Sequence, residues 1–220
     1  MIRALFLSAA AAGLAGGLVA AAYQALVATP LILEAEIFEH AAEIAGAAAT
    51  HAAEGADFGR HFLTSLATIV LATGGALILL GLMVLDGGAI TAKRALLWGA
   101  GAFVALALAP AVGLPPELPG IPAGDLAGRQ IWWLATVIAT ALGLWLIFSR
   151  SSPATIVFGL VVIVLPHVIG APQPVSHDSD VPAGLAAQFA AASLAGSLIL
   201  WHLVSTIAGA AFQRWGPSET

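Results

Sequence analysis

The chain has 220 residues, of which 60% are hydrophobic and only 9% are charged, and its mean hydropathy is +0.99. These values lie far outside the range of soluble globular proteins, so they predict an all-α, polytopic integral membrane protein with a single transmembrane domain. Cysteine is absent, which excludes a disulfide framework, a thiolate metal site and an iron–sulfur cluster. The seven lysines and arginines form no basic stripe, which argues against a nucleic-acid partner.

Six apolar stretches approach the length of about 20 residues that a helix needs to cross a bilayer. The fifth is the weakest, because it is short and contains Pro166. The alternative is a five-span arrangement in which the fifth stretch is re-entrant, and this would move the loop of His177 to the other side. The six stretches are 4–28, 62–85, 95–112, 131–148, 153–169 and 185–212.

The first stretch has two interpretations. Arg3 ahead of an apolar run resembles a secretory signal peptide, whose apolar core is usually about 7 to 15 residues long. This run is much longer, and the four-residue spacing of Gly13 and Gly17 suits close helix packing in lipid. A retained helix is therefore favoured. Thr29 and Pro30 then predict the N-cap and first turn of a separate helix.

Acidic residues and histidines crowd into the segment 29–61. On a helix, Glu36, His40 and Glu43 would share one face, and such a face could hold a divalent cation. The word His-Ala-Ala-Glu occurs at His40 and again at His51, so Glu54 repeats the pattern close to three helical turns later. The alternative is a solvated, acidic helix at the membrane surface whose histidines are incidental.

Charge asymmetry predicts the orientation. With six spans and a cytoplasmic N-terminus, five basic residues lie inside and only Arg60 and Arg129 lie outside, as the positive-inside rule requires. Nearly all the carboxylates then fall outside, where they would concentrate cations. Three segments are expected on the outer face: the acidic and histidine-bearing 29–61, the Pro/Gly-rich loop 113–130 and the His/Asp loop 170–184.

The loop 113–130 is dense in proline and glycine, so it forms neither a regular helix nor a strand. Most of it is apolar, and we expect it to fold back against the helices with Glu117 paired to Arg129. Trp132 and Trp133 follow as the next span begins. A tryptophan pair beside an arginine is typical of an interfacial anchor.

The last outer loop follows His167 and contains His177, Asp178 and Asp180, an oxygen-and-nitrogen donor set that borderline divalent metals accept. As a generic polar loop it would need no function. His202 is the clearest ionisable residue inside a span, and such residues usually face a pathway or a partner. The alternative is a neutral histidine that is hydrogen-bonded to a neighbouring helix.

Motifs for enzymes are missing. The sequence contains no zinc-protease His-Glu-x-x-His, no Gly-x-Ser-x-Gly and no phosphate-binding loop, so we expect neither an enzyme nor an ATPase. An intramembrane metalloenzyme built on the Glu and His cluster is the weakest alternative, because no recognised catalytic spacing is present.

Several stretches together resemble one family. They are Thr-Pro-Leu-Ile-Leu-Glu-Ala-Glu at 29–36, Gly-Leu-Pro-Pro-Glu-Leu-Pro-Gly at 113–120, Arg-Gln-Ile-Trp-Trp at 129–133 and Leu-Pro-His-Val-Ile-Gly-Ala-Pro at 165–172. In this order, they make the chain similar to the CbtA family of probable cobalt transporter subunits. The resemblance implies a component of the bacterial inner membrane that takes up cobalt for cobalamin synthesis. It also implies a small one-span partner, CbtB, whose histidines are proposed to bind metal.

The sequence thus supports two hypotheses. In the first, the chain admits Co²⁺ as a substrate, with no permanently bound cofactor, and the ion passes Glu117 and His202 between the spans. The metal-capturing residues would be Glu36, His40, Glu43, His51, Glu54, His177 and Asp178. In the second, the chain is a non-transporting scaffold for a metal-binding partner. Either hypothesis is compatible with a homo-oligomer in the lipid bilayer.

Overall fold

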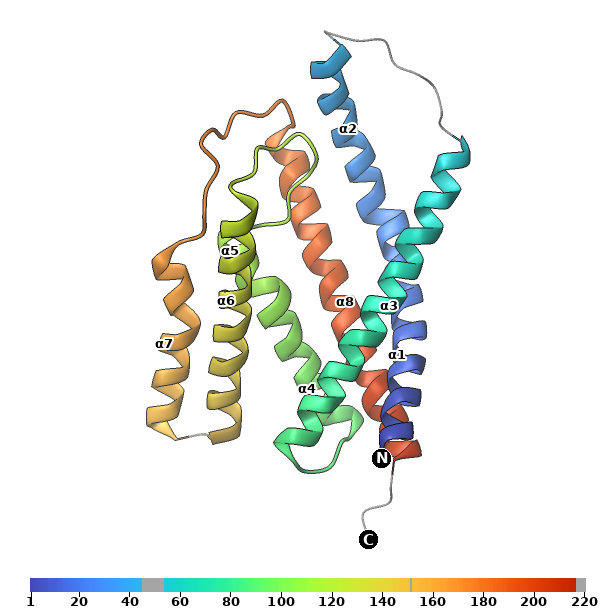
Figure 1. The fold of residues 1–220 in the computed structure, drawn as a ribbon, viewed down its shortest axis with the longest axis vertical. Coiled ribbons are helices and arrows are strands. Elements are labelled where there is room, and N and C mark those ends of the chain that lie inside the picture. Colours follow the sequence, from blue (N-terminus) through green and yellow to red (C-terminus); the bar gives the residue numbers. More distant parts are fainter. Residues whose placement is uncertain (45–53, 151, 217–220) are drawn as a thin grey trace. The chain divides into compact units, whose positions relative to one another are not determined.

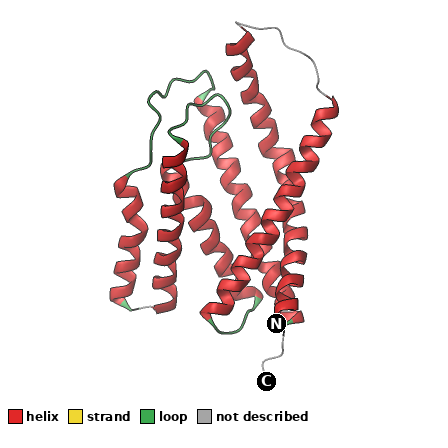
Figure 2. Cartoon of the chain, viewed as in Figure 1, coloured by secondary structure: helices red, strands yellow, loops and turns green. Residues whose placement is uncertain are grey.

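A computed structural model describes residues 1–44, 54–150 and 152–216, and it leaves the side chains of 39–44 and 54–58 undescribed. Every regular element in these residues is helical (Figure 2), which confirms the all-α prediction. The α-helices are α1 (Ile2–Tyr23), α2 (Thr29–Ile44), α3 (Glu54–Asp86), α4 (Ala92–Phe103), α5 (Ala109–Gly113), α6 (Leu126–Trp145), α7 (Pro153–Ile169) and α8 (Ala183–Trp215). Three π-helical segments adjoin them: η1 (Gln24–Ala28), η2 (Val104–Leu108) and η3 (Leu146–Arg150).

Five helices of the described residues are long and apolar enough to cross a membrane. They are Ile2–Phe38, Gly59–Asp86, Ala92–Gly113, Leu126–Arg150 and Ala183–Trp215. The fifth predicted stretch, 153–169, forms α7, an apolar helix of 17 residues. At 1.5 Å per residue α7 is only about 25 Å long. The fifth predicted span is therefore the shortest, as its sequence indicated.

The expected N-cap at Thr29 is wrong. Helix continues from Ile2 to Phe38 without a break, and Thr29 has helical angles, with φ −60° and ψ −44°. The backbone N–H of Thr29 bonds to the carbonyl of Gln24, five residues back, so the turn before Pro30 is widened into a π-helix. Because proline lacks an N–H and its ring crowds the preceding turn, a local widening lets the helix continue through it.

The same π-helical segment before a proline recurs eighty residues later in the sequence. Tyr23–Pro30 and Phe103–Pro110 share the pattern aromatic-x-Ala-Leu-x-x-x-Pro. In each, a five-residue π-helical segment begins after the aromatic residue, and the residue before proline donates its N–H five residues back, from Ala109 to Val104 in the second case. The chain therefore carries two copies of one helical element.

Contacts divide the chain into two compact units, and the first comprises Met1–Pro30, Ile44–Ala100 and Ala195–Thr220. Within it, α1 packs on α3 and on the second half of α8 through small residues. A Cβ at Gly17 would lie 2.8 Å from Cα of Ile69, and one at Gly16 would lie 2.6 Å from Val204. Close packing at Gly13 and Gly17, predicted from their spacing, is confirmed.

The second unit comprises Leu31–Glu43 and Gly101–Leu194. Within it, α6 and α7 lie side by side and antiparallel (Figure 1). The backbones approach at Gly143 and Gly159, and towards the start of α6 the indole N–H of Trp132 donates to the carbonyl of Pro166. The chain after α7 therefore returns to the end of the unit at which α6 begins.

One apolar cluster holds this end of the second unit together. Its buried members come from α2, the loop 114–125, the chain before α8 and the first turn of α8, and they are Ala35, Leu118, Val181 and Leu185. Leu31, Ile32, Phe38, Ile121 and Phe189 pack around them. The cluster thus brings the start of the acidic segment to both proline-rich loops.

Candidate cation-binding site at the proline-rich loops

The first loop follows α5 and is anchored by Leu118, which is 3% exposed. Prolines at 115, 116, 119 and 122 restrict the backbone, and the loop reverses at Gly120, whose φ of +79° suits glycine. The N–H of Ile121 closes this turn on the carbonyl of Leu118. The expectation that the loop folds back on the helices is confirmed.

Glu117 and Arg129 form the predicted ion pair. Arg129 is held in the first turn of α6, where the Asp125 side chain caps the helix by accepting the N–H of Gly128 at 2.7 Å. From there, Nη2 of Arg129 donates to Oε2 of Glu117 at 2.5 Å. Both side chains are about one quarter exposed, 23% for Arg129 and 24% for Glu117, so the pair lies at a solvent boundary.

The second loop begins at Gly170, which ends α7 with a φ of +88°. The hydroxyl of Ser179 donates to the carbonyl of Gly120 at 2.9 Å, and Gly124 lies against the backbone of Pro172 and Gln173. The two loops are therefore tied to each other at both ends.

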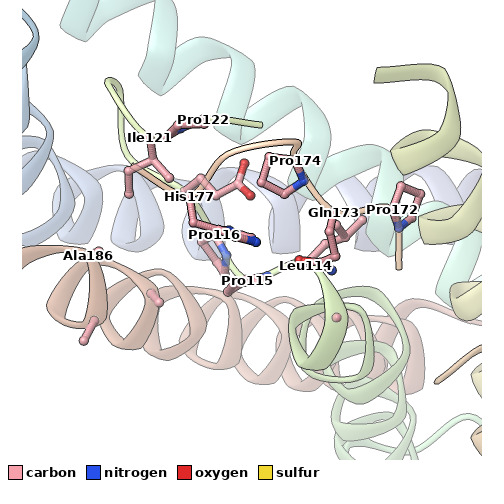
Figure 3. Close-up of a pocket in the computed structure, with 14 residues that line it drawn as sticks. Leu114, Pro115, Pro116, Ile121, Pro122, Pro172, Gln173, Pro174, His177 and Ala186 are labelled. Atoms are coloured by element: carbon pink, nitrogen blue, oxygen red, sulfur yellow. The ribbon is translucent and has the colours of Figure 1, made fainter. Parts of the chain in front are cut away.

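A pocket of about 340 Å³ lies between the two loops and the first turns of α8 (Figure 3). Its polar side chains come from both loops: Glu117 from the first, Gln173 and His177 from the second. Figure 3 shows His177 among Pro116, Ile121 and Pro174. The walls are otherwise apolar: Gly113, Leu114, Pro115, Pro116, Ile121, Pro122, Pro172, Pro174, Ala186, Ala187 and Ala190.

Each of the three polar side chains keeps an atom that is available as a metal ligand. Arg129 bonds Oε2 of Glu117, which leaves Oε1 without a partner among the described residues. The side-chain amide nitrogen of Gln173 donates to the carbonyl of Ala171 at 3.2 Å, so its side-chain oxygen remains available as a ligand. Within the same described part of the chain, the His177 imidazole makes no hydrogen bond. Two oxygens and one nitrogen are thus available, a set that suits a borderline divalent metal.

The other predicted metal ligands are placed only in part. Glu36 is half-buried on α2, and Asp178 is exposed and bonded to Ser176 in its own loop. The backbone of α2 carries His40 and Glu43 in the expected helical register, but their side chains, like that of Glu54 and all of His51, lie outside the described residues. Among the described side chains, no three His, Asp or Glu form a metal-holding group.

Trp132 and Trp133 do not act as a pair. Trp132 is 7% exposed, bonds Pro166 and packs edge-on against His167 with ring centroids 5.7 Å apart, so it belongs to the α6–α7 interface. Trp133 is 38% exposed. The anchor interpretation therefore fails for Trp132, because the 100° step between neighbouring helical residues turns it inward.

His202 lies in the first unit and is half-buried. Its Nδ1 is 2.9 Å from the carbonyl of Leu198, one turn earlier in the same helix. A carbonyl accepts only, so the proton must be on Nδ1. This local bond differs from the alternative interpretation, in which His202 bonds to a neighbouring helix, and a role of His202 in a pathway stays a prediction.

Sequence reasoning missed Gln173 as a pocket residue. The available signal was its place between Pro172 and Pro174, because two prolines stiffen the backbone and fix the direction of the residue between them.

A family model described as probable cobalt transporter subunit (CbtA) matches residues 2–213. No curated protein matches the chain, and no solved structure does. The match covers nearly the whole sequence, including both loops that line the pocket.

Proposed function

Since the chain belongs to the CbtA family of probable cobalt transporter subunits, we propose that it admits Co²⁺ to the cell through the pocket between its two proline-rich loops. The observation that carries the proposal is the convergence of Glu117, Gln173 and His177, with unused donor atoms, on one pocket. Imidazole and carboxylate ligands suit Co²⁺, although the general order of affinity favours Ni²⁺ over it.

The size of the pocket supports capture of a hydrated ion. A water occupies about 30 Å³, so six waters around a metal need roughly 180 Å³, and a pocket of about 340 Å³ accommodates them. The incoming ion would then exchange some of its waters for protein ligands.

The charge distribution supports an outward-facing pocket. With a cytoplasmic N-terminus, the pocket loops and the acidic segment lie on the outer face of a bacterial inner membrane. Glu36, His40, Glu43, His51, Glu54 and Asp178 remain predicted residues of that acidic face, where they would raise the local cation concentration. In this proposal the ion goes on to supply cobalamin synthesis.

The proposal is tested by cobalt uptake into proteoliposomes that contain the purified chain, with Ni²⁺ and Zn²⁺ as competitors. We expect Glu117→Gln and His177→Ala each to reduce uptake at limiting cobalt by about tenfold, the scale for loss of one ligand-sphere interaction. Asp180→Asn is the matched control, because it removes one carboxylate from the same exposed loop without altering the pocket lining. Unchanged uptake in both pocket variants would refute the proposal.

A scaffold role is the second candidate. It is favoured by the lack of a group of three His, Asp or Glu among the described side chains, since a partner would then supply the missing ligands. The partner would be a small one-span CbtB-type subunit with a histidine-rich segment. Uptake that begins only when this subunit is added to the proteoliposomes would support the scaffold role and contradict the proposal that the chain transports cobalt alone.

A further inference from the structure

Only one member of the Glu117–Arg129 pair lines the pocket. Glu117 lines the pocket, whereas Arg129 does not, and Arg129 holds the carboxylate through Oε2 at 2.5 Å. The guanidinium therefore stands immediately behind the carboxylate that would receive a cation. It fixes the direction of Glu117 and leaves Oε1 to the pocket.

Stability alone does not account for this pair. Each side chain is about one quarter exposed, and ion pairs at such a solvent boundary usually contribute little to folding. The loop has other anchors, namely the burial of Leu118 and the bond from Ser179 to Gly120. The main effect of the pair is therefore on the pocket and not on the stability of the fold.

The charge balance of the pocket depends on Arg129. Of the polar side chains that line it, Glu117 is the acidic one, and the guanidinium of Arg129 is paired with it. Asp125, the nearest acidic residue in sequence, is used as the N-cap of α6. Only the carboxylate of Glu117 would separate a divalent ion bound at Oε1 from the positive charge of Arg129. The guanidinium would therefore repel the ion.

We infer that Arg129 is a positioning residue that weakens cation binding at Glu117, so that the ion is held briefly and released inward. This inference rests on the proposed function. It predicts that removing the positive charge tightens binding and slows transport, because an ion that binds more strongly leaves more slowly. A residue with a structural role alone would lower both binding and transport.

The test compares Arg129→Gln with Arg129→Lys in the full-length protein. Cobalt binding is measured by titration calorimetry, and uptake is measured over a range of cobalt concentrations. We expect Arg129→Gln to lower both the Kd for Co²⁺ and the KM for uptake by about tenfold, the lower end of the effect of one charge at this range, and to lower the maximal rate. Arg129→Lys keeps the charge and should stay within about twofold of the parent Kd.

Two further variants separate the outcomes. Arg150→Gln removes a positive charge from the opposite end of the same continuous helix, and it should change neither Kd nor KM. Glu117→Gln should abolish the calorimetric signal. Equal or weaker binding in Arg129→Gln, or tenfold tighter binding in Arg129→Lys, would overturn the inference while the site stands. Unchanged binding in Glu117→Gln would overturn the site itself.

Discussion

Adjacent residues of one helix can belong to different environments. Trp132 lies inside the α6–α7 interface, whereas Trp133 is exposed. The carbonyl of Pro166 accepts both the indole N–H of Trp132 and the backbone N–H of Gly170. Trp132 therefore fixes α7 through one residue, but that carbonyl keeps a partner when the indole is removed.

We expect Trp132→Phe to lower the free energy of unfolding by about 1 kcal/mol, the usual net value of one hydrogen bond. Trp132→Ala should cost about 3 to 5 kcal/mol, because it also leaves a cavity. Thermal unfolding in detergent measures both changes. Trp133→Phe is the control and should be neutral, so equal losses at the two positions would contradict this assignment.

At the scale of single residues, the sequence predicted the contact that depends on opposite charges, the ion pair. Glu117 and Arg129 pair as expected, because they carry opposite charges on an apolar loop and on the helix start against which that loop folds. The inward direction of Trp132 depends on the packing of α7, which hydropathy does not encode. Gln173 was missed for the same reason, since the pocket exists only after two distant loops meet.

At the scale of elements, small residues set how closely helices approach. Gly13 on α1 has no room for a side chain, because a Cβ there would lie 2.6 Å from Cα of Thr73 on α3. Gly74, one residue further along α3, has nothing within 4 Å of a built Cβ. Gly13, in the interface, and Gly74, which faces open space, thus offer a matched pair of glycines.

Gly13→Ala should destabilise the protein by about 1 to 3 kcal/mol, the cost of forcing extra volume into a packed contact. Gly74→Ala should cause no loss, since it adds a methyl group in open space and alanine favours a helix. Chemical unfolding in mixed micelles compares the two. Similar losses would show that conformational freedom, not close approach, makes glycine necessary at both positions.

The helices themselves followed from apolar length and composition. Their boundaries at proline did not, because Thr-Pro at 29–30 has the same residue types as a helix start. The deciding factor is the π-helical turn before Pro30, whose i to i−5 bond becomes visible only in the backbone. The second copy before Pro110 could have been found by comparing the sequence with itself, since the eight-residue pattern repeats at a spacing of eighty.

At the scale of the whole molecule, orientation can be read directly because the chain has no cysteine of its own. Val175 is fully exposed in the second pocket loop, and Ala89 is exposed in the turn between α3 and α4. Each position therefore accepts a single reporter cysteine. The proposed topology places them on opposite faces of the membrane.

In intact cells, a membrane-impermeant maleimide should label Val175→Cys fully and Ala89→Cys only after permeabilisation. The reason is the bias of basic residues towards the cytoplasmic face. Ala123→Cys, in the exposed part of the first loop, is the control and should follow Val175→Cys. The reverse pattern would invert the orientation and place the pocket inside the cell.

The shortness of α7 has a consequence for the lipid around the protein. A helix of about 25 Å cannot match a hydrocarbon layer of about 30 Å, and its close contact with α6 at Gly143 and Gly159 limits its freedom to move alone. A crossing by α7 therefore requires the bilayer to thin along that flank. Cobalt uptake should be faster in vesicles of short-chain than of long-chain phospholipids, and membrane thickness would then act on cobalt supply through the helix that carries the second pocket loop.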